Sequence, residues 1–241
     1  MKKIIQRANE RGTANHGWLK ANFSFSFANY YNPKKVNFGA LRVLNDDIIE
    51  PAMGFGKHPH DNMEIITIPL EGALKHRDSM SDKWLTLETG EVQIMSAGSG
   101  LMHSEMNNSK IKHLNLFQIW ILPNKNEVMP RYDQKKFDAS DRNNKLQVLV
   151  SSIDKNEVNE SLKIHQDAQI SRIDLNENTE FNYKLKSESH GVFVMVIRGE
   201  IIIDNEVLTK RDTVEISQTK IVNLKAKKNS ELLFIQVPML F

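Results

Sequence analysis

The sequence predicts an all-β protein that is built from two antiparallel β-barrels. Short β-rich runs follow one another closely in both halves of the chain, with turn residues between them and no long helical periodicity. A length of 241 residues, of which 40% are hydrophobic, is enough for two small barrels that each bury a core.

The first barrel is expected to span residues 1–137. Phenylalanine alternates with serine over residues 23–27, which is the strand period and predicts one apolar and one polar face. Residues 38–44 are expected to form a further strand, with Asn45, Asp46 and Asp47 as its turn. More strands are predicted at residues 65–70, 74–76, 85–87, 92–95 and 114–122.

The second barrel is expected to span residues 138–241. Residues 139–145 have the polar composition of a linker, which places the domain boundary there. Strands are then predicted at residues 146–151, 168–175, 179–185, 191–203, 213–216, 221–224 and 231–237. No His-x-His or His-x-Glu pair occurs in this half, so we expect it to lack metal ligands.

Two pairs of residues in the first half have a metal-chelating spacing. His58 and His60 are separated by one residue, and so are His103 and Glu105. Because side chains alternate along a strand, this spacing puts both members of a pair on the same face. Imidazole and carboxylate ligands suit Fe(II), Mn, Ni, Cu or Zn, and four of them leave positions open on an octahedral ion.

The spacing leaves one choice between two glutamates open. Glu64 has the same strand parity as His58 and His60 and is therefore an alternative to Glu105. Four residues beyond His60, however, correspond to roughly 13 Å of extended strand, so Glu64 would need strong bending to return to the metal.

The motifs resemble the pirin family of the cupin superfamily. The segments GFGKHPHDNMEIIT, EGALKHRDS, VQIMSAGSGLMHSEMN and FGALRVLNDDII carry this resemblance. It implies a bicupin, that is, two cupin (jelly-roll) barrels of which only the first binds metal. It also implies one divalent transition-metal ion per chain, with Fe(II) as the first choice, held by His58, His60, His103 and Glu105.

The same resemblance implies an activity and an alternative to it. Bacterial members include quercetin 2,3-dioxygenases, so we expect an enzyme that cleaves flavonols with O2, in which Glu105 is both a ligand and the base that accepts the hydroxyl proton. Other pirins resemble redox-responsive transcriptional cofactors, which would hold the same metal and bind a protein partner without turnover. A cupin isomerase or a purely structural metal is a third possibility.

Further residues near the motifs have ordinary interpretations. His16 has no partner at chelating spacing and is expected at the surface, whereas His76 stands alone between the two pairs and is expected at a strand end. Trp120 is expected in the core, with pocket lining as the alternative. Pocket walls suited to a flat aromatic substrate could come from Met53, Phe55, Met95, Met102 and Phe117, although ordinary barrel core is the favoured interpretation of each one.

Composition limits the partners. With 32 basic and 30 acidic residues, no overall field attracts nucleic acid or a membrane surface. The absence of cysteine excludes disulfides and thiolate ligands and suits a reducing compartment. The N-terminal apolar run is too short for a signal peptide, and no apolar stretch is long enough to span a bilayer. We therefore expect a cytoplasmic protein with small or neutral partners. The family resemblance implies that the partner is a small phenolic compound, and we expect a monomer.

Overall fold

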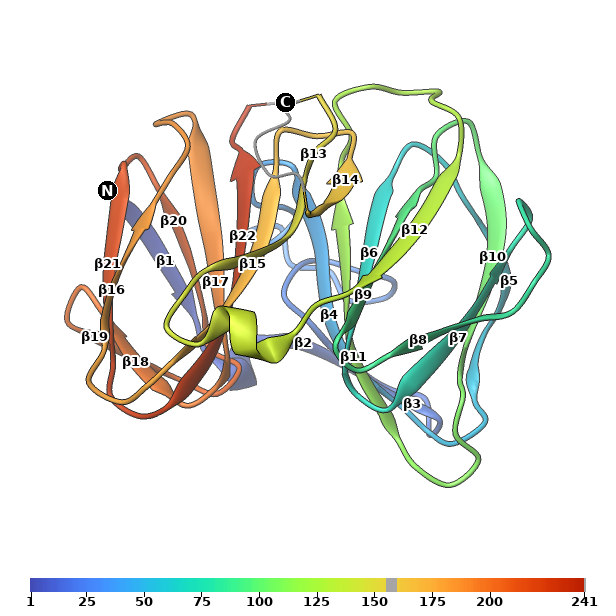
Figure 1. Cartoon of the computed structure of the whole chain (residues 1–241), viewed down its shortest axis with the longest axis horizontal. Coiled ribbons are helices and arrows are strands. Elements are labelled where there is room, and N and C mark those ends of the chain that lie inside the picture. Colours follow the sequence, from blue (N-terminus) through green and yellow to red (C-terminus); the bar gives the residue numbers. More distant parts are fainter. Residues whose placement is uncertain (155–159, 241) are drawn as a thin grey trace.

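The computed structural model describes residues 1–154 and 160–240, which form two jelly rolls side by side (Figure 1). The N-terminal half contains the 3-10 helix η1 (Ala8–Glu10) and strands β2 (Gly12–Asn15), β3 (Leu19–Phe23), β4 (Leu41–Ile49), β5 (Gly54–His60), β6 (Glu64–Glu71), β7 (Ala73–Asp78), β8 (Leu85–Glu88), β9 (Glu91–Ser96), β10 (Leu101–Asn107), β11 (Leu114–Ile121) and β12 (Arg131–Lys136). The C-terminal half contains η2 (Ala139–Arg142), β13 (Gln147–Ser152), β14 (Leu162–Ile164), β15 (Gln169–Leu175), β16 (Glu180–Lys184), β17 (His190–Arg198), β18 (Glu200–Ile203), β19 (Glu206–Thr209), β20 (Thr213–Ser217), β21 (Ile221–Ala226) and β22 (Ser230–Pro238).

Each half is a sandwich of one seven-stranded and one four-stranded sheet. The N-terminal half pairs its strands in the orders β12-β9-β6-β11-β4-β3-β2 and β5-β10-β7-β8. The C-terminal half uses β1-β20-β17-β22-β15-β13-β14 and β16-β21-β18-β19, in which β1 is Lys2–Gln6. The predicted all-β, two-unit cupin architecture is confirmed, although hydrogen bonding leaves each jelly roll as two curved sheets and does not close it into a barrel.

The largest core lies between the halves. It joins side chains from both seven-stranded sheets, such as Phe117 from β11 and Phe193 from β17. Central strands such as β17 (HGVFVMVIR) are therefore buried on both faces, which explains their continuous apolar sequence. Two smaller clusters fill part of the N-terminal interior, and one larger cluster fills the C-terminal interior.

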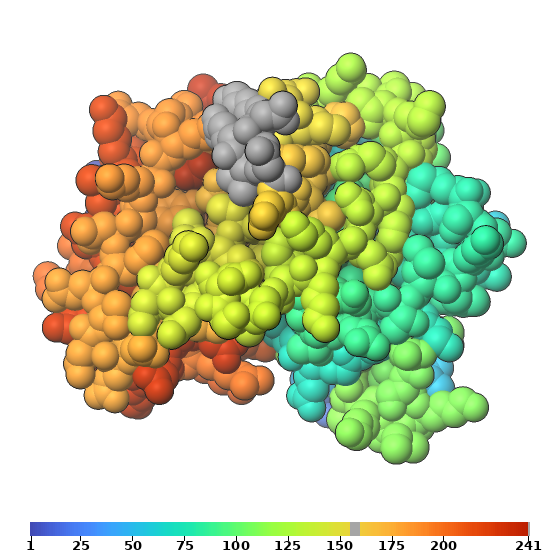
Figure 2. Space-filling view, in the orientation of Figure 1, coloured from blue at the N-terminus to red at the C-terminus, as the bar shows by residue number. Residues whose placement is uncertain are grey.

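The predicted domain boundary stays a prediction. It falls between β12 and η2, but β1 crosses it, because this first strand extends the sheet of the C-terminal half by pairing with β20. Figure 2 shows the two halves packed together, with a notch between them at the lower edge. Among the described residues, no helix is long and apolar enough to cross a membrane.

Three of the strand predictions were wrong in detail. The alternating segment at residues 23–27 was predicted to be a strand, but β3 already ends at Phe23. Ser24, Phe25 and Ser26 are all buried, and Phe25 enters the core between the halves. The run predicted over residues 191–203 is two strands, broken at Gly199. This glycine has φ +93°, and a Cβ there would lie 2.3 Å from the Ser230 hydroxyl oxygen.

The third error concerns Asn45, Asp46 and Asp47, which are not a turn but the middle of β4. The strand begins only at Leu41 and pairs with β3 on one side and β11 on the other, so these residues lie inside a sheet. Their side chains alternate between the jelly-roll interior and the interface with the other half. Asp46 faces that interface, where it accepts hydrogen bonds from Arg11 and Arg211.

Candidate metal centre

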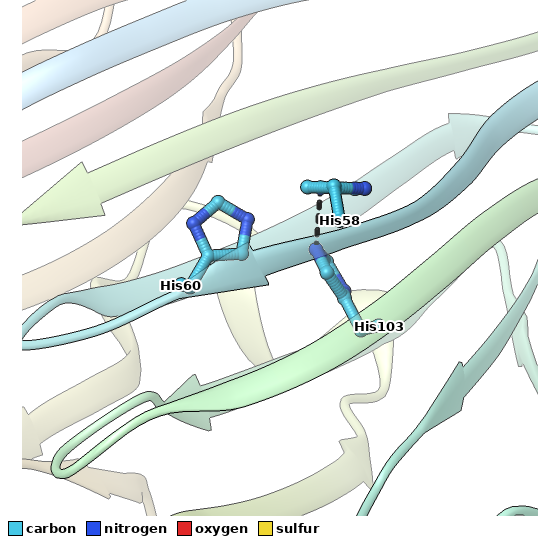
Figure 3. Close-up of side chains that lie close together, drawn as sticks. All are labelled: His58, His60 and His103. Carbon is cyan, nitrogen blue, oxygen red and sulfur yellow. Dashed lines mark hydrogen bonds between the residues drawn. The ribbon is translucent and has the colours of Figure 1, made fainter.

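Three imidazoles meet on two neighbouring strands. In the four-stranded sheet β5 pairs with β10, and the register puts His103 directly opposite His58 (Figure 3). Their Nε2 atoms are 2.9 Å apart, and the ring of His60 lies 4.9 Å from that of His58 and 4.8 Å from that of His103. One possible ligand atom from each of the three residues lies within 4.8 Å of the others. The one-residue spacing thus puts His58 and His60 on one face, as predicted.

Burial keeps His60 and His103 in the neutral state that binds metal. The Nδ1–H of His58 donates to the Gly56 carbonyl at 2.8 Å, which turns its Nε2 toward His103. Burial, and next the neighbouring His58, lowers the pKa of His103 to about 2. The same two causes lower the pKa of His60 to about 4. At neutral pH both rings therefore offer lone pairs.

Glu105 lies beside His103, two residues along β10. Its carboxylate is 3% exposed, and Oε2 accepts a hydrogen bond from the Gln118 side chain at 3.0 Å. Its other oxygen, Oε1, is buried without a hydrogen-bond partner among the described residues. Burial raises the pKa of Glu105 to about 7. A possible ligand atom of Glu105 lies within 4.8 Å of one of His103, but Glu105 does not share the compact group of His58 and His60.

His76 is closer to this centre than the sequence suggested. It lies within β7, not at its end, is fully buried, and shares a possible ligand group with His103 and Glu105. Both of its ring nitrogens are already engaged, however. Nε2 lies 3.0 Å from the Asp78 carboxylate, and Nδ1 lies 3.4 Å from the Gln93 amide nitrogen. His76 thus packs beside His103, with 5.3 Å between the ring centroids, while Asp78 and Gln93 contact its ring nitrogens. The His-x-Asp pair on β7 is the sequence signal that could have indicated this position.

Glu64 lies outside both groups of possible ligands among the described residues. It is 1% exposed at the start of β6, which belongs to the other sheet, and its carboxylate accepts a hydrogen bond from the Ser96 hydroxyl at 2.7 Å. Burial raises its pKa to about 7 as well. The spacing argument that kept Glu64 as an alternative is therefore not supported by its position.

The donor set fits a divalent transition-metal ion. The imidazole nitrogens of the half-buried His58 and the buried His103 face each other at 2.9 Å, and the neighbouring carboxylate has one buried oxygen without a partner among the described residues. Buried polar atoms normally have partners, and lone pairs this close repel one another unless a proton or a cation lies between them. Neutral imidazoles with one carboxylate are the ligands that iron, nickel and zinc accept.

A pocket of about 620 Å³ opens onto the histidines. Its walls are largely aromatic: Trp18 packs edge-on against Phe55 at 5.2 Å, and Phe27 packs edge-on against Trp120 at 5.4 Å. The exposed His16 lies at its rim. Such walls suit a flat aromatic ligand.

Four of the five proposed wall residues do not line this pocket. Only Phe55 does, together with Trp120, for which pocket lining was the alternative. Phe117 points into the core between the halves, Met95 into a separate interior cluster, and Met53 is exposed. Met102 is half-buried elsewhere. Apolar character alone did not indicate which face of each strand lines the pocket.

The pocket also contains polar side chains that sequence reasoning missed. Asn45, Asp47 and Gln118 line it beside the predicted Glu105. Burial, and next the charges of Asp46 and Glu105, raises the pKa of Asp47 to about 8. The alternation of β4 could have indicated that Asn45 and Asp47 share a face, had these residues been recognised as a strand.

The interior of the C-terminal half is filled differently. Its hydrophobic cluster includes Tyr183, whose ring stacks on Phe234 at 4.7 Å and whose hydroxyl donates to the side chain of the buried Gln236. Both groups of possible ligands among the described residues lie in the N-terminal half.

Comparison with known proteins agrees with the two-part architecture. Residues 5–121 match the sequence model of the family described as Pirin, and residues 149–237 match that of the quercetinase C-terminal cupin domain. The chain is 43% identical over 234 residues to the quercetin 2,3-dioxygenase of Escherichia coli strain K12, which covers 97% of this chain and 98% of that protein. The chain belongs to the pirin family. The resemblance predicted from the motifs is thereby confirmed.

Two further relatives extend this comparison. The crystal structure of the bacterial pirin YhhW from Escherichia coli in complex with nickel(II) matches this pirin with a TM-score of 0.91 at 40% identity, over 98% of this chain and 99% of that one. A pirin-like protein of Caulobacter vibrioides is 38% identical over 224 residues, which are 93% of this chain and 94% of that protein.

Proposed function

We propose that this pirin is a metal-dependent dioxygenase that cleaves flavonols such as quercetin with O2. The observation that carries the proposal is the meeting of His58, His60 and His103 at one end of an aromatic pocket. The relatives that match over nearly the whole chain and are named quercetin 2,3-dioxygenase support it.

One divalent ion would be held by His58, His60, His103 and Glu105, with Fe(II) as the first choice and Mn, Ni, Cu and Zn as others. The nickel complex of the related YhhW supports a metal of this kind. When bound, the ion would supply Lewis acidity that makes the flavonol hydroxyl more acidic and the ring more reactive toward O2.

The protein's own residues would position the substrate and move its proton. The aromatic walls formed by Trp18, Phe55 and Trp120 would hold the flat rings and exclude water. Glu105 would be both a ligand and the base that accepts the hydroxyl proton, since its pKa of about 7 suits proton transfer near neutral pH. Gln118, which donates to Oε2, would keep that carboxylate in place.

The test is oxygen uptake with quercetin, expressed as turnover per bound metal ion. Glu105→Gln should retain some metal through the three histidines but lose about 10²- to 10⁴-fold in turnover, because an amide cannot accept the proton. His103→Ala should lose metal and activity together, so excess metal should partly restore it. Glu64→Gln is the matched control, since it removes an equally buried carboxylate outside the cluster and should keep both metal and turnover.

Two results would contradict this assignment. Near-wild-type turnover in metal-loaded Glu105→Gln would leave Glu105 as a ligand only. Metal binding without oxygen uptake, combined with a metal-dependent change in binding to a protein partner, would favour the regulatory alternative. We also propose a cytoplasmic monomer, which sedimentation and cell fractionation would test.

A further inference from the structure

Two polar side chains of β4 line the metal pocket, and each has an oxygen without a partner in the part of the chain that the structure describes. Asn45 is 3% exposed and Asp47 is 4% exposed, and both line the pocket that contains the histidines. An oxygen of each side chain is buried and has no hydrogen-bond partner among the described residues. The two residues are two positions apart on one strand, so they share the face that looks into the jelly roll.

On the opposite face of β4, by contrast, the buried carboxylate of Asp46 is fully paired within the protein. Asp46 receives hydrogen bonds from the Arg211 Nε at 2.7 Å, the Asn115 Nδ2 at 3.0 Å and the Arg11 Nη2 at 3.2 Å. Unsatisfied buried polar groups are rare in native proteins, and those that occur need a specific explanation. For Asn45 and Asp47, the pocket into which they point suggests a ligand as the missing partner.

The two groups of polar residues lie on different sheets of the same sandwich. The histidines are on β5 and β10 of the four-stranded sheet, whereas Asn45 and Asp47 are on β4 of the seven-stranded sheet. Gln118 pairs with Asn45 across the β4–β11 ladder. Its side chain, however, already donates a hydrogen bond to Glu105 and accepts one from Thr67. A ligand that reaches the histidines with one ring can therefore present its other polar groups to Asn45 and Asp47.

We propose that Asn45 and Asp47 form a subsite that hydrogen-bonds the hydroxyls of a flavonol beyond the one that reaches the metal. The pocket would then select polyhydroxylated flavonols over the same skeleton without those hydroxyls. This inference rests on the proposed function, because it takes the flavonol class from there. It adds the residues that determine specificity within that class.

The test compares quercetin with 3-hydroxyflavone, which has the same skeleton and only the metal-directed hydroxyl. Dissociation constants are measured on the nickel-loaded protein without oxygen, so that no turnover occurs. The wild type should bind quercetin at least about tenfold more tightly, as expected for two or more hydrogen bonds to otherwise unsatisfied groups. The double variant Asn45→Leu/Asp47→Leu should bring this ratio to within about twofold by weakening quercetin binding alone.

The controls separate recognition from folding. Because an oxygen of each side chain is buried without a partner among the described residues, replacement of both residues by apolar groups of similar size should leave the thermal midpoint unchanged or raise it. Asp47→Asn and Asn45→Asp, which retain hydrogen-bonding oxygens, should retain most of the quercetin preference. Asp46→Asn, on the opposite face of the same strand, should lower the midpoint and leave the binding ratio intact.

The outcomes also separate this inference from the proposed function. If wild-type protein prefers quercetin and the double variant does not, the subsite stands, even if no oxygen uptake is found and the dioxygenase proposal fails. If oxygen uptake occurs but the double variant keeps the wild-type ratio, the subsite is refuted while the dioxygenase stands. Equal wild-type affinity for the two compounds, or no binding of either, also refutes the subsite.

Discussion

Replacing Glu105 by glutamine should make the metal-free protein more stable at pH 8. Burial raises the pKa of this carboxyl from 4.5 to about 7 in the folded protein. The stability that the protonated form contributes is fully present below pH 4.5 and is lost as the pH rises through 7. At about 1.4 kcal/mol per pKa unit, the loss amounts to about 3 kcal/mol at pH 8. Glutamine stays neutral over this pH range, so the variant should not show this loss of stability.

The assay is urea unfolding of metal-free protein at pH 5 and pH 8, followed by tryptophan fluorescence. All three tryptophans, Trp18, Trp84 and Trp120, lie in the N-terminal half, so the signal reports on the half that contains the site. The comparison between wild type and variant isolates Glu105 from other carboxyls with raised pKa values. Because a part of the loss has already occurred at pH 5, Glu105→Gln should lose about 2.5 kcal/mol less than the wild type between the two pH values.

Glu64→Gln provides the control, since the pKa of Glu64 is also raised to about 7. Both variants should therefore gain stability at pH 8, but only one should lose its response to metal. Nickel at about 100 times its dissociation constant should add about 2.7 kcal/mol to the wild type and to Glu64→Gln, and clearly less to Glu105→Gln. An unchanged pH dependence in Glu105→Gln would show that the buried carboxyl titrates normally. An equal response to nickel would show that Glu105 is not a ligand.

Two further predictions concern stoichiometry and the interface between the halves. Metal analysis should find one tightly bound ion per chain, because the possible ligand groups among the described residues lie in the N-terminal half. A second tightly bound ion in the C-terminal half would contradict this assignment. Arg211→Ala should lower the free energy of unfolding by about 3 kcal/mol at neutral pH, because it removes the 2.7 Å ion pair with Asp46. Lys3→Ala is the control. It removes an ion pair with the half-exposed Asp204 and should lower the free energy of unfolding by less than about 1 kcal/mol. Burial opposes ionisation of Asp46, but Arg211 and the other hydrogen-bonding partners outweigh it and lower its pKa, so this contribution should disappear as the pH falls below 4. Equal costs for the two variants in urea unfolding would refute this account of the interface.

The local part of the metal site could be predicted from sequence, because it follows from side-chain alternation. His58 and His60 share a face for that reason alone. That His103 lies opposite His58 depends instead on strand register, which no short stretch of sequence encodes. Here only the family resemblance connected the two motifs. The same limit explains His76, which reaches the centre because β7 pairs with β10 on the side away from β5.

The error at Asn45, Asp46 and Asp47 has a different physical cause. Three consecutive Asn or Asp residues favour a turn when only neighbouring residues are considered. Tertiary contacts override that preference, because the partners of Asp46 include Arg11 and Arg211, which lie 35 and 165 residues away. The Oδ1 atoms of Asn45 and Asp47 have no such partners within residues 1–154 and 160–240. Local sequence could predict neither the pairing of one face nor the unpaired state of the other.

The core that the two halves share explains how the polar pocket is tolerated. Among the described residues, the pocket half leaves several buried atoms unsatisfied, among them Asp47 Oδ1, Glu105 Oε1 and Trp120 Nε1, each of which costs about 1–3 kcal/mol. Both halves contribute side chains to the core between them, and the C-terminal interior adds a further hydrophobic cluster. The seven-stranded sheet that presents Asn45 and Asp47 is thus packed against the other half on its outer face. We infer that the C-terminal half stabilises a neighbour whose interior is arranged for binding.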